Sequence, residues 1–112
     1  MNIQFKPEPK AGQILSAKLG SNLTVSFKIR SNPVPSNVTW IRIQEDLSYN
    51  ITSGEETEKY SAKKIEIIND LLFQVDLEIR NVTFEDQDFQ NILKVENVLG
   101  EQNYLFEINV EL

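Results

Sequence analysis

The stretch that decides the fold is GSNLTVSFKIRSNPVPSNVTWIRI, residues 20–43. Between Leu23 and Arg30 apolar and polar residues alternate strictly, which is the period of a β-strand with one buried face. A loop rich in Pro, Ser and Asn follows, and a second alternating run then carries Val38 and Trp40 on one face. These residues predict two strands of an all-β domain, joined by a loop.

The same alternation recurs along the rest of the chain, and turn residues separate the runs. Further strands are expected at residues 3–5, 14–19, 47–52, 65–67, 73–79, 92–98 and 104–112. Tight turns are expected at 69–70 and at 100–103. Ile, Val and Thr number 25 against only three Ala, a composition that favours sheet over helix. About eight or nine strands without a repeat or a linker predict a single domain over residues 1–112, built as a two-sheet β-sandwich.

The composition excludes several classes of function. The 112 residues contain no Cys and no His, which removes thiol chemistry, serine–histidine catalysis and nearly every transition-metal site. The net charge of −6 disfavours binding to nucleic acid and to anionic membranes. The chain has no signal-peptide pattern and no apolar run long enough to span a membrane. We therefore expect a protein partner, with no catalytic residue, metal or cofactor, and no direct membrane contact by this segment.

Several motifs together resemble the immunoglobulin superfamily. GxxLxVxF at 20–27 resembles strand B of that family, with Phe27 at the usual position of a cysteine. Trp40 resembles the strand C tryptophan that packs against the disulfide. The stretch 77–86 resembles strand E and the corner before strand F, and 95–100 resembles the F–G turn of intermediate-set domains. The resemblance implies an immunoglobulin-like two-sheet sandwich over nearly the whole chain.

The sequence departs from the family pattern around the disulfide. The second cysteine position falls on Leu93 or Ile92, depending on the motif from which it is counted. The resemblance therefore implies an apolar core of Phe27, Trp40 and Leu93 in place of a disulfide. The family's tyrosine, two residues earlier, is replaced by Gln90 or Asn91.

The spacing between the two cysteine positions bears on the subtype. Phe27 and Leu93 lie 66 residues apart, a separation that resembles variable-type domains. This spacing leaves room for a C′ strand at 47–52 and a C″ strand at 58–61. The chain therefore resembles a variable-type domain with intermediate-set features. A fibronectin type III module also lacks cysteine, but the motifs fit it less well.

The resemblance also implies roles for charged residues near strand F. Arg42 points inward on strand C, where it is expected to form an ion pair at the edge of the core. Lys63 or Lys64 is expected to pair with Asp86. The acidic run at 85–88 has oxygen atoms that calcium could use, but it is interpreted as a polar corner because other calcium motifs are missing.

Two signals about the cellular compartment oppose each other. Four N-glycosylation sequons are present where composition alone gives about one, and they lie at Asn22, Asn37, Asn50 and Asn81. They predict glycosylation and an extracellular location. The absence of cysteine supports the opposing interpretation, a reducing compartment, as in the cytosolic immunoglobulin domains of giant muscle proteins.

The candidate binding surface is the outer face of the G-F-C-C′ sheet, which faces partners in variable-type domains. Alternation points four aliphatic residues outward there, with a charged rim and a tyrosine from the C′ strand. The predicted partner-binding residues are Ile41, Ile43, Tyr49, Ile92, Lys94, Glu96, Leu105 and Glu107. An exposed apolar patch with a polar rim is typical of an interface. The alternatives are that the strand around Tyr49 covers the patch or that a bulge reverses strand F.

These expectations combine into one functional hypothesis. The chain is interpreted as an extracellular recognition or adhesion domain of a cell-surface receptor, homophilic toward the same domain on an opposing cell. It resembles the allorecognition receptors of hydroids, which are invertebrate self-recognition proteins. The alternative is a structural immunoglobulin module of a cytosolic elastic or scaffolding protein.

Overall fold

The computed structural model describes residues 3–6 and 13–112. One short 3₁₀ helix, η1 (Phe84–Asp88), interrupts a succession of strands. The strands are β1 (Ile3–Lys6), β2 (Gln13–Lys18), β3 (Leu23–Ser31), β4 (Asn37–Gln44), β5 (Leu47–Thr52), β6 (Tyr60–Ala62), β7 (Glu66–Asn69), β8 (Leu72–Ile79), β9 (Gln90–Asn97) and β10 (Gly100–Glu111). The predicted strands are thus confirmed, with boundaries shifted by a few residues.

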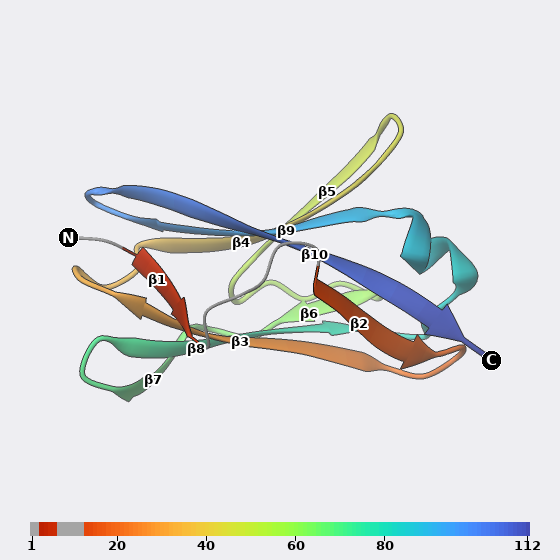
Figure 1. Cartoon of the computed structure of the whole chain (residues 1–112), viewed down its shortest axis with the longest axis horizontal. Helices are drawn as coiled ribbons and strands as arrows, with labels where there is room; N and C mark the ends of the chain where they lie inside the picture. Colours follow the sequence, from red (N-terminus) through yellow and green to blue (C-terminus); the bar gives the residue numbers. More distant parts are fainter. Residues whose placement is uncertain (1–2, 7–12) are drawn as a thin grey trace.

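The described strands form two five-stranded sheets that pack face to face (Figure 1). One sheet has the order β1-β3-β8-β6, with β7 also paired to β8, and the other has the order β2-β10-β9-β4-β5. Strands β6 and β7 lie along the same edge of β8 and together act as one interrupted strand. All pairs are antiparallel except β2 with β10, which is parallel. The predicted all-β, two-sheet sandwich is confirmed.

The expected C′ strand exists, but the expected C″ strand is wrong. β5 pairs with β4 along its whole length, as a C′ strand does. The segment predicted as C″ contributes to β6, which pairs with β8 in the opposite sheet. Tyr60 and Ala62 are buried there, because this register places them opposite Ile79 and Leu77 at the edge of the core. Within the described residues, the β2-β10-β9-β4-β5 sheet therefore ends at β5, which removes the main variable-type feature.

The turn expected at 100–103 is also wrong. β10 starts at Gly100, which pairs with Asn97, so the hairpin turns at Val98 and Leu99. The reason lies in the Asn97 side chain, which is buried: its Oδ1 accepts from the Leu99 backbone N–H at 2.8 Å. Its Nδ2 donates to the Ser31 hydroxyl at 3.1 Å, which ties the turn to the end of β3. Gly100 follows with φ of +158°, near extended backbone.

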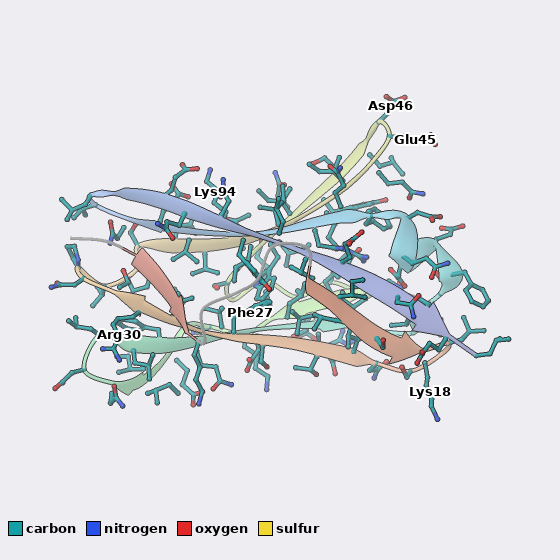
Figure 2. All side chains as sticks on the ribbon, viewed as in Figure 1. Lys18, Phe27, Arg30, Glu45, Asp46 and Lys94 are labelled. Carbon is teal, nitrogen blue, oxygen red and sulfur yellow. The ribbon has the colours of Figure 1, made fainter. Side chains whose placement is uncertain are left out.

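An aromatic cluster occupies the place of the missing disulfide. Phe27 lies between the sheets (Figure 2), with its ring centroid 6.1 Å from that of Trp40 and 4.8 Å from that of Tyr104. Phe106 joins them at 5.8 Å from Phe27. Leu93 is fully buried opposite Trp40 across the β4–β9 ladder. The core of Phe27, Trp40 and Leu93 therefore exists, and Leu93 rather than Ile92 points inward.

The β4–β5 hairpin projects away from the body of the sandwich (Figure 1). Its tip is the two-residue turn of Glu45 and Asp46, which both lie at the far end of the projection (Figure 2). Glu45 has φ of +50°, the left-handed conformation that such tight turns require. The hairpin therefore extends the β2-β10-β9-β4-β5 sheet beyond the region that the opposite sheet covers.

Candidate protein-interaction surface

The outer face of the β2-β10-β9-β4-β5 sheet carries a row of aliphatic side chains. Ile41 on β4 lies directly opposite Ile92 on β9, and Ile92 lies directly opposite Leu105 on β10. Side chains of directly paired residues point to the same face. Their neighbours along each strand, such as Trp40 and Leu93, are buried on the inner face. The row of Ile41, Ile92 and Leu105 therefore crosses three strands on the outer face, as the sequence predicted.

Two more isoleucines extend this row into a patch. Ile43 follows Ile41 along β4 and is half-buried. Ile14 on β2 pairs with Glu107 and therefore shares the outer face, although it was not among the predicted partner-binding residues. Ile14 and Leu105 are the most accessible members, with 61% and 57% of their surface exposed. We call Ile14, Ile41, Ile43, Ile92 and Leu105 the aliphatic patch.

Tyr49 does not belong to this patch. It pairs with Arg42, whose side chain points inward, so Tyr49 lies on the inner side of the projecting hairpin. Its ring packs 6.3 Å from the ring of Tyr60 and 6.0 Å from that of Phe89. The placement of Tyr49 on the outer face was therefore wrong, because the two-residue turn at the hairpin tip fixes the register of β5.

The charged rim is present at two ends of the patch. Lys94 lies on the outer side of the sheet (Figure 2), with its Nζ 4.0 Å from a carboxylate oxygen of Glu96 and 3.8 Å from one of Glu101. Such partly exposed pairs contribute about 0–1 kcal/mol to stability. Glu107 borders the patch next to Ile14. The rim is therefore a mixed-charge surface that can influence the choice of partner more than it stabilises the fold.

The four sequons divide between two regions. Asn22 and Asn81 are exposed and adjacent, because the Asn81 backbone N–H donates to Asn22 Oδ1 at 3.0 Å. Asn37 and Asn50 lie instead on the outer face of the β4 sheet, opposite Glu96 and Ile41 respectively. Asn37 and Asn50 therefore share the face of the aliphatic patch, whereas Asn22 and Asn81 lie together elsewhere.

On the inner face of the β2-β10-β9-β4-β5 sheet, Arg42 of β4 is the centre of a buried polar network. Its Nη1 donates to Asp86 Oδ1 and to the Tyr60 hydroxyl, both at 2.9 Å, and its Nη2 donates to the Asp86 carbonyl oxygen at 2.8 Å. Its Nε donates to Asn91 Oδ1 at 2.7 Å. The guanidinium also lies 4.3 Å from the ring centroid of Phe89, a cation–π contact. The predicted buried pair of Arg42 therefore exists, and Asn91 adds a further buried hydrogen bond to it.

The second cation of the network is Lys59, so the prediction of Lys63 or Lys64 was wrong. Lys59 Nζ donates to Asp86 Oδ2 at 2.9 Å. Asp86 Oδ2 also accepts from the Thr83 backbone N–H at 2.8 Å, which closes the first turn of η1. Lys63 and Lys64 are exposed and lie one and two residues beyond the end of β6. They lie past the point where the chain approaches Asp86.

The environment of the network shifts the pKa values of two of its members, Asp86 and Tyr60. Burial alone would raise the pKa of Asp86, but the Thr83 N–H, Lys59 and Arg42 together outweigh it and hold the pKa below its usual value. Burial raises the pKa of the Tyr60 hydroxyl, and the neighbouring Arg42 opposes that rise. Asp86 is therefore ionised at neutral pH and its negative charge is neutralised by two cations.

This lowered pKa predicts an acid-dependent loss of stability. Because Asp86 has a lower pKa in the folded state than the value of about 3.9 in an unfolded chain, its stabilising contribution is complete above about pH 5. It declines as the pH falls through 3.9 toward the folded-state pKa. We expect the difference in unfolding free energy between the wild type and Asp86→Asn, measured by urea denaturation, to shrink between pH 5 and pH 2. A difference that stays constant over this range would contradict the prediction.

The described part of the chain holds neither a metal-binding cluster nor a membrane-spanning helix. Residues 85–88, considered as a calcium cluster, do not form a metal-binding group, and the residues that the structure describes contain no cluster of His, Cys, Asp and Glu suited to a metal ion. In the same part of the chain, no helix has the length and hydrophobicity that crossing a membrane requires.

A second exposed apolar group lies where the β3–β4 loop meets the β9–β10 turn, and it consists of Val34, Val98 and Leu99. The sequence pattern did not indicate this group because apolar residues in a tight turn are unusual.

Comparisons with known proteins support the fold. No protein-family model matches the sequence, and no curated protein matches it. Among solved structures, the chain is similar to the titin Ig tandem domains A164-A165, with a TM-score of 0.70 and 17% sequence identity. The match covers 99% of this chain and 50% of the titin chain. The chain therefore has an immunoglobulin-like fold, similar to titin Ig domains, built without any cysteine.

Proposed function

We propose that this domain is an extracellular recognition module that binds a second copy of itself through the outer face of the β2-β10-β9-β4-β5 sheet. The observation that carries the proposal is the row of Ile41, Ile92 and Leu105, which crosses three strands on a face that the opposite sheet does not cover. Apolar side chains gathered on one face, with a charged rim, are the usual composition of a protein interface. The exposed aliphatic area gives affinity, and the rim gives selectivity.

The charges on the outer face fit this mode of association. Lys94 lies between acidic residues near one end of the patch, whereas Glu107 borders the other end. A two-fold dimer places each surface against the same surface of its partner, in a self-complementary arrangement. In a two-fold arrangement that brings opposite ends of the patch together, Lys94 of one copy approaches Glu107 of the other. Recognition of self then depends on the rim residues of the two copies.

An extracellular location is the part of the proposal that the sequons support. Asn22, Asn50 and Asn81 are all exposed and therefore compatible with attached glycans in the folded state. The aromatic cluster around Phe27 fills the core without a disulfide, so packing of the core does not depend on an oxidising or a reducing compartment. The absence of cysteine thus does not oppose secretion.

The substitution Leu105→Lys is expected to weaken self-association at least tenfold. It places a charge in the aliphatic patch, which must then be desolvated in the interface. Because 57% of Leu105 is exposed, folding should be little affected. The measurement is sedimentation equilibrium of glycan-free protein over a wide concentration range, together with a thermal unfolding scan of each variant.

The matched control is Ile67→Lys, the same kind of change at a residue of β7 that is 73% exposed in the other sheet. It should leave self-association unchanged. A wild type that stays monomeric at the highest concentration, or equal association of the wild type and Leu105→Lys, would show that this face does not bind a second copy.

A structural module of a multidomain protein is the second candidate function. It is favoured by the similarity to a tandem of titin Ig domains and by Val34, Val98 and Leu99, exposed at one end of the sandwich. The buried Asn97 holds the turn that carries Val98 and Leu99. If this is the function, the end of the domain that carries Val98 and Leu99 makes the contacts with neighbouring domains. The outer face of the β2-β10-β9-β4-β5 sheet then makes none, and Leu105→Lys leaves these contacts unchanged.

A further inference from the structure

Asn50 lies on the outer face of the β2-β10-β9-β4-β5 sheet, beside the aliphatic patch. Asn50 is exposed in the middle of β5 and pairs directly with Ile41 of the aliphatic patch. Paired residues of antiparallel strands point to the same side, so the Asn50 amide stands beside Ile41. Its side-chain amide makes no hydrogen bond to any other residue in the described part of the chain. It begins the sequon Asn50-Ile51-Thr52 and is therefore chemically free to carry a glycan.

The other sequon on this face differs in one important respect. Asn37 is half-buried, and its Nδ2 donates to Glu96 Oε1 at 3.3 Å and to Thr39 Oγ1 at 3.4 Å. Nδ2 is the atom to which an N-linked sugar attaches, and a substituted amide keeps only one N–H. Glycosylation of Asn37 would therefore cost one of these contacts, whereas glycosylation of Asn50 costs none. The structure thus favours Asn50 over Asn37 as the glycan site on the outer face.

We infer that Asn50 carries an N-linked oligosaccharide that covers the β4–β5 side of the aliphatic patch and weakens self-association by limiting it to the β10–β2 side. The inference rests on the proposed homophilic function. Neighbouring strands lie about 4.8 Å apart, so Ile41 is about 5 Å from the attachment strand and Leu105 about 14 Å from it. The first sugars therefore lie over Ile41, while Leu105 and Ile14, the two most exposed members of the patch, stay accessible.

The test uses protein secreted by cultured animal cells, with Asn50→Gln and Thr52→Ala as two independent ways to remove the sequon. Asn81→Gln is the matched control, because Asn81 is an exposed sequon remote from this face. Intact mass before and after enzymatic removal of glycans gives the occupancy of each site. Sedimentation equilibrium gives the dissociation constant for self-association. We expect each Asn50-sequon variant to lose one glycan and to associate about tenfold more tightly than the wild type, and Asn81→Gln to associate as the wild type does.

The possible failures are distinguishable. An unmodified Asn50 would overturn the inference, as would a glycan at Asn50 whose removal leaves the dissociation constant unchanged. In both cases the proposed function survives if Leu105→Lys still weakens association. Absence of self-association in the enzymatically deglycosylated protein would overturn both the inference and the proposed function.

Discussion

Replacing Asp86 with Asn is expected to lower the free energy of unfolding at pH 7 by about 3–5 kcal/mol. The change removes the negative charge that neutralises Arg42, whose side chain is only 1% exposed. An uncompensated charge in that position is costly, because the surrounding core cannot solvate it. Asn also presents an N–H to a site that now accepts from Lys59 and the Thr83 backbone. Denaturation in urea, followed by tryptophan fluorescence from Trp40, measures the loss.

The control for this prediction is Glu56→Gln, the same carboxylate-to-amide change in a surface pair. Glu56 Oε2 is 3.0 Å from Arg80 Nη2, but the Glu56 side chain is 65% exposed. Pairs of this kind contribute about 0–1 kcal/mol. If both variants lose equally little stability, the buried network does not hold η1 against β4, and the structural role assigned to Asp86 is wrong.

The second large effect is expected from Phe27→Ala, which should lower the free energy of unfolding by about 3 kcal/mol. Phe27 contacts the rings of Trp40, Tyr104 and Phe106, which come from both strands β4 and β10 of the opposite sheet. Truncating it leaves a cavity at the point where other immunoglobulin-like domains have a covalent link between the sheets. The expected value is at the lower end of the range for Phe because Phe27 is only partly buried.

Phe84→Ala removes the same atoms from η1, where 46% of the residue is exposed, and should change the free energy of unfolding by less than about 1 kcal/mol. Equilibrium denaturation at pH 7 compares the two variants directly. A loss below about 1 kcal/mol for Phe27→Ala would mean that the aromatic cluster does not replace the disulfide.

Alternation of residue types predicted most of the strands and the inward or outward direction of their side chains. It works for Leu23 to Arg30 and for the row of Ile41, Ile92 and Leu105 because one face of each strand must be buried. It could not assign β6 to a sheet, since three residues fit either edge equally well. Only the burial of Tyr60 against β8 decides that choice.

The failures near the candidate site come from two causes, the geometry of turns and the long-range pairing of strands. The position of Tyr49 depends on the two-residue turn at Glu45 and Asp46, and counting outward from this turn pairs Tyr49 with the inward-facing Arg42. The choice of Lys59 as the second partner of Asp86 depends on how the chain enters β6. Ile14 was missed because the parallel register of β2 against β10 joins segments from opposite ends of the sequence. Local patterns hold no information on such long-range pairings.

The core without a disulfide has a consequence for the response of the domain to mechanical force. A cross-link between the positions of Phe27 and Leu93, which are 66 residues apart in the sequence, would withhold about 220 Å of chain from extension. Here the aromatic cluster joins the sheets through contact alone, so once it ruptures the whole chain of 112 residues can extend to about 380 Å. A change in the redox state of the surroundings leaves this extension unchanged, because no bond in the domain responds to a reductant.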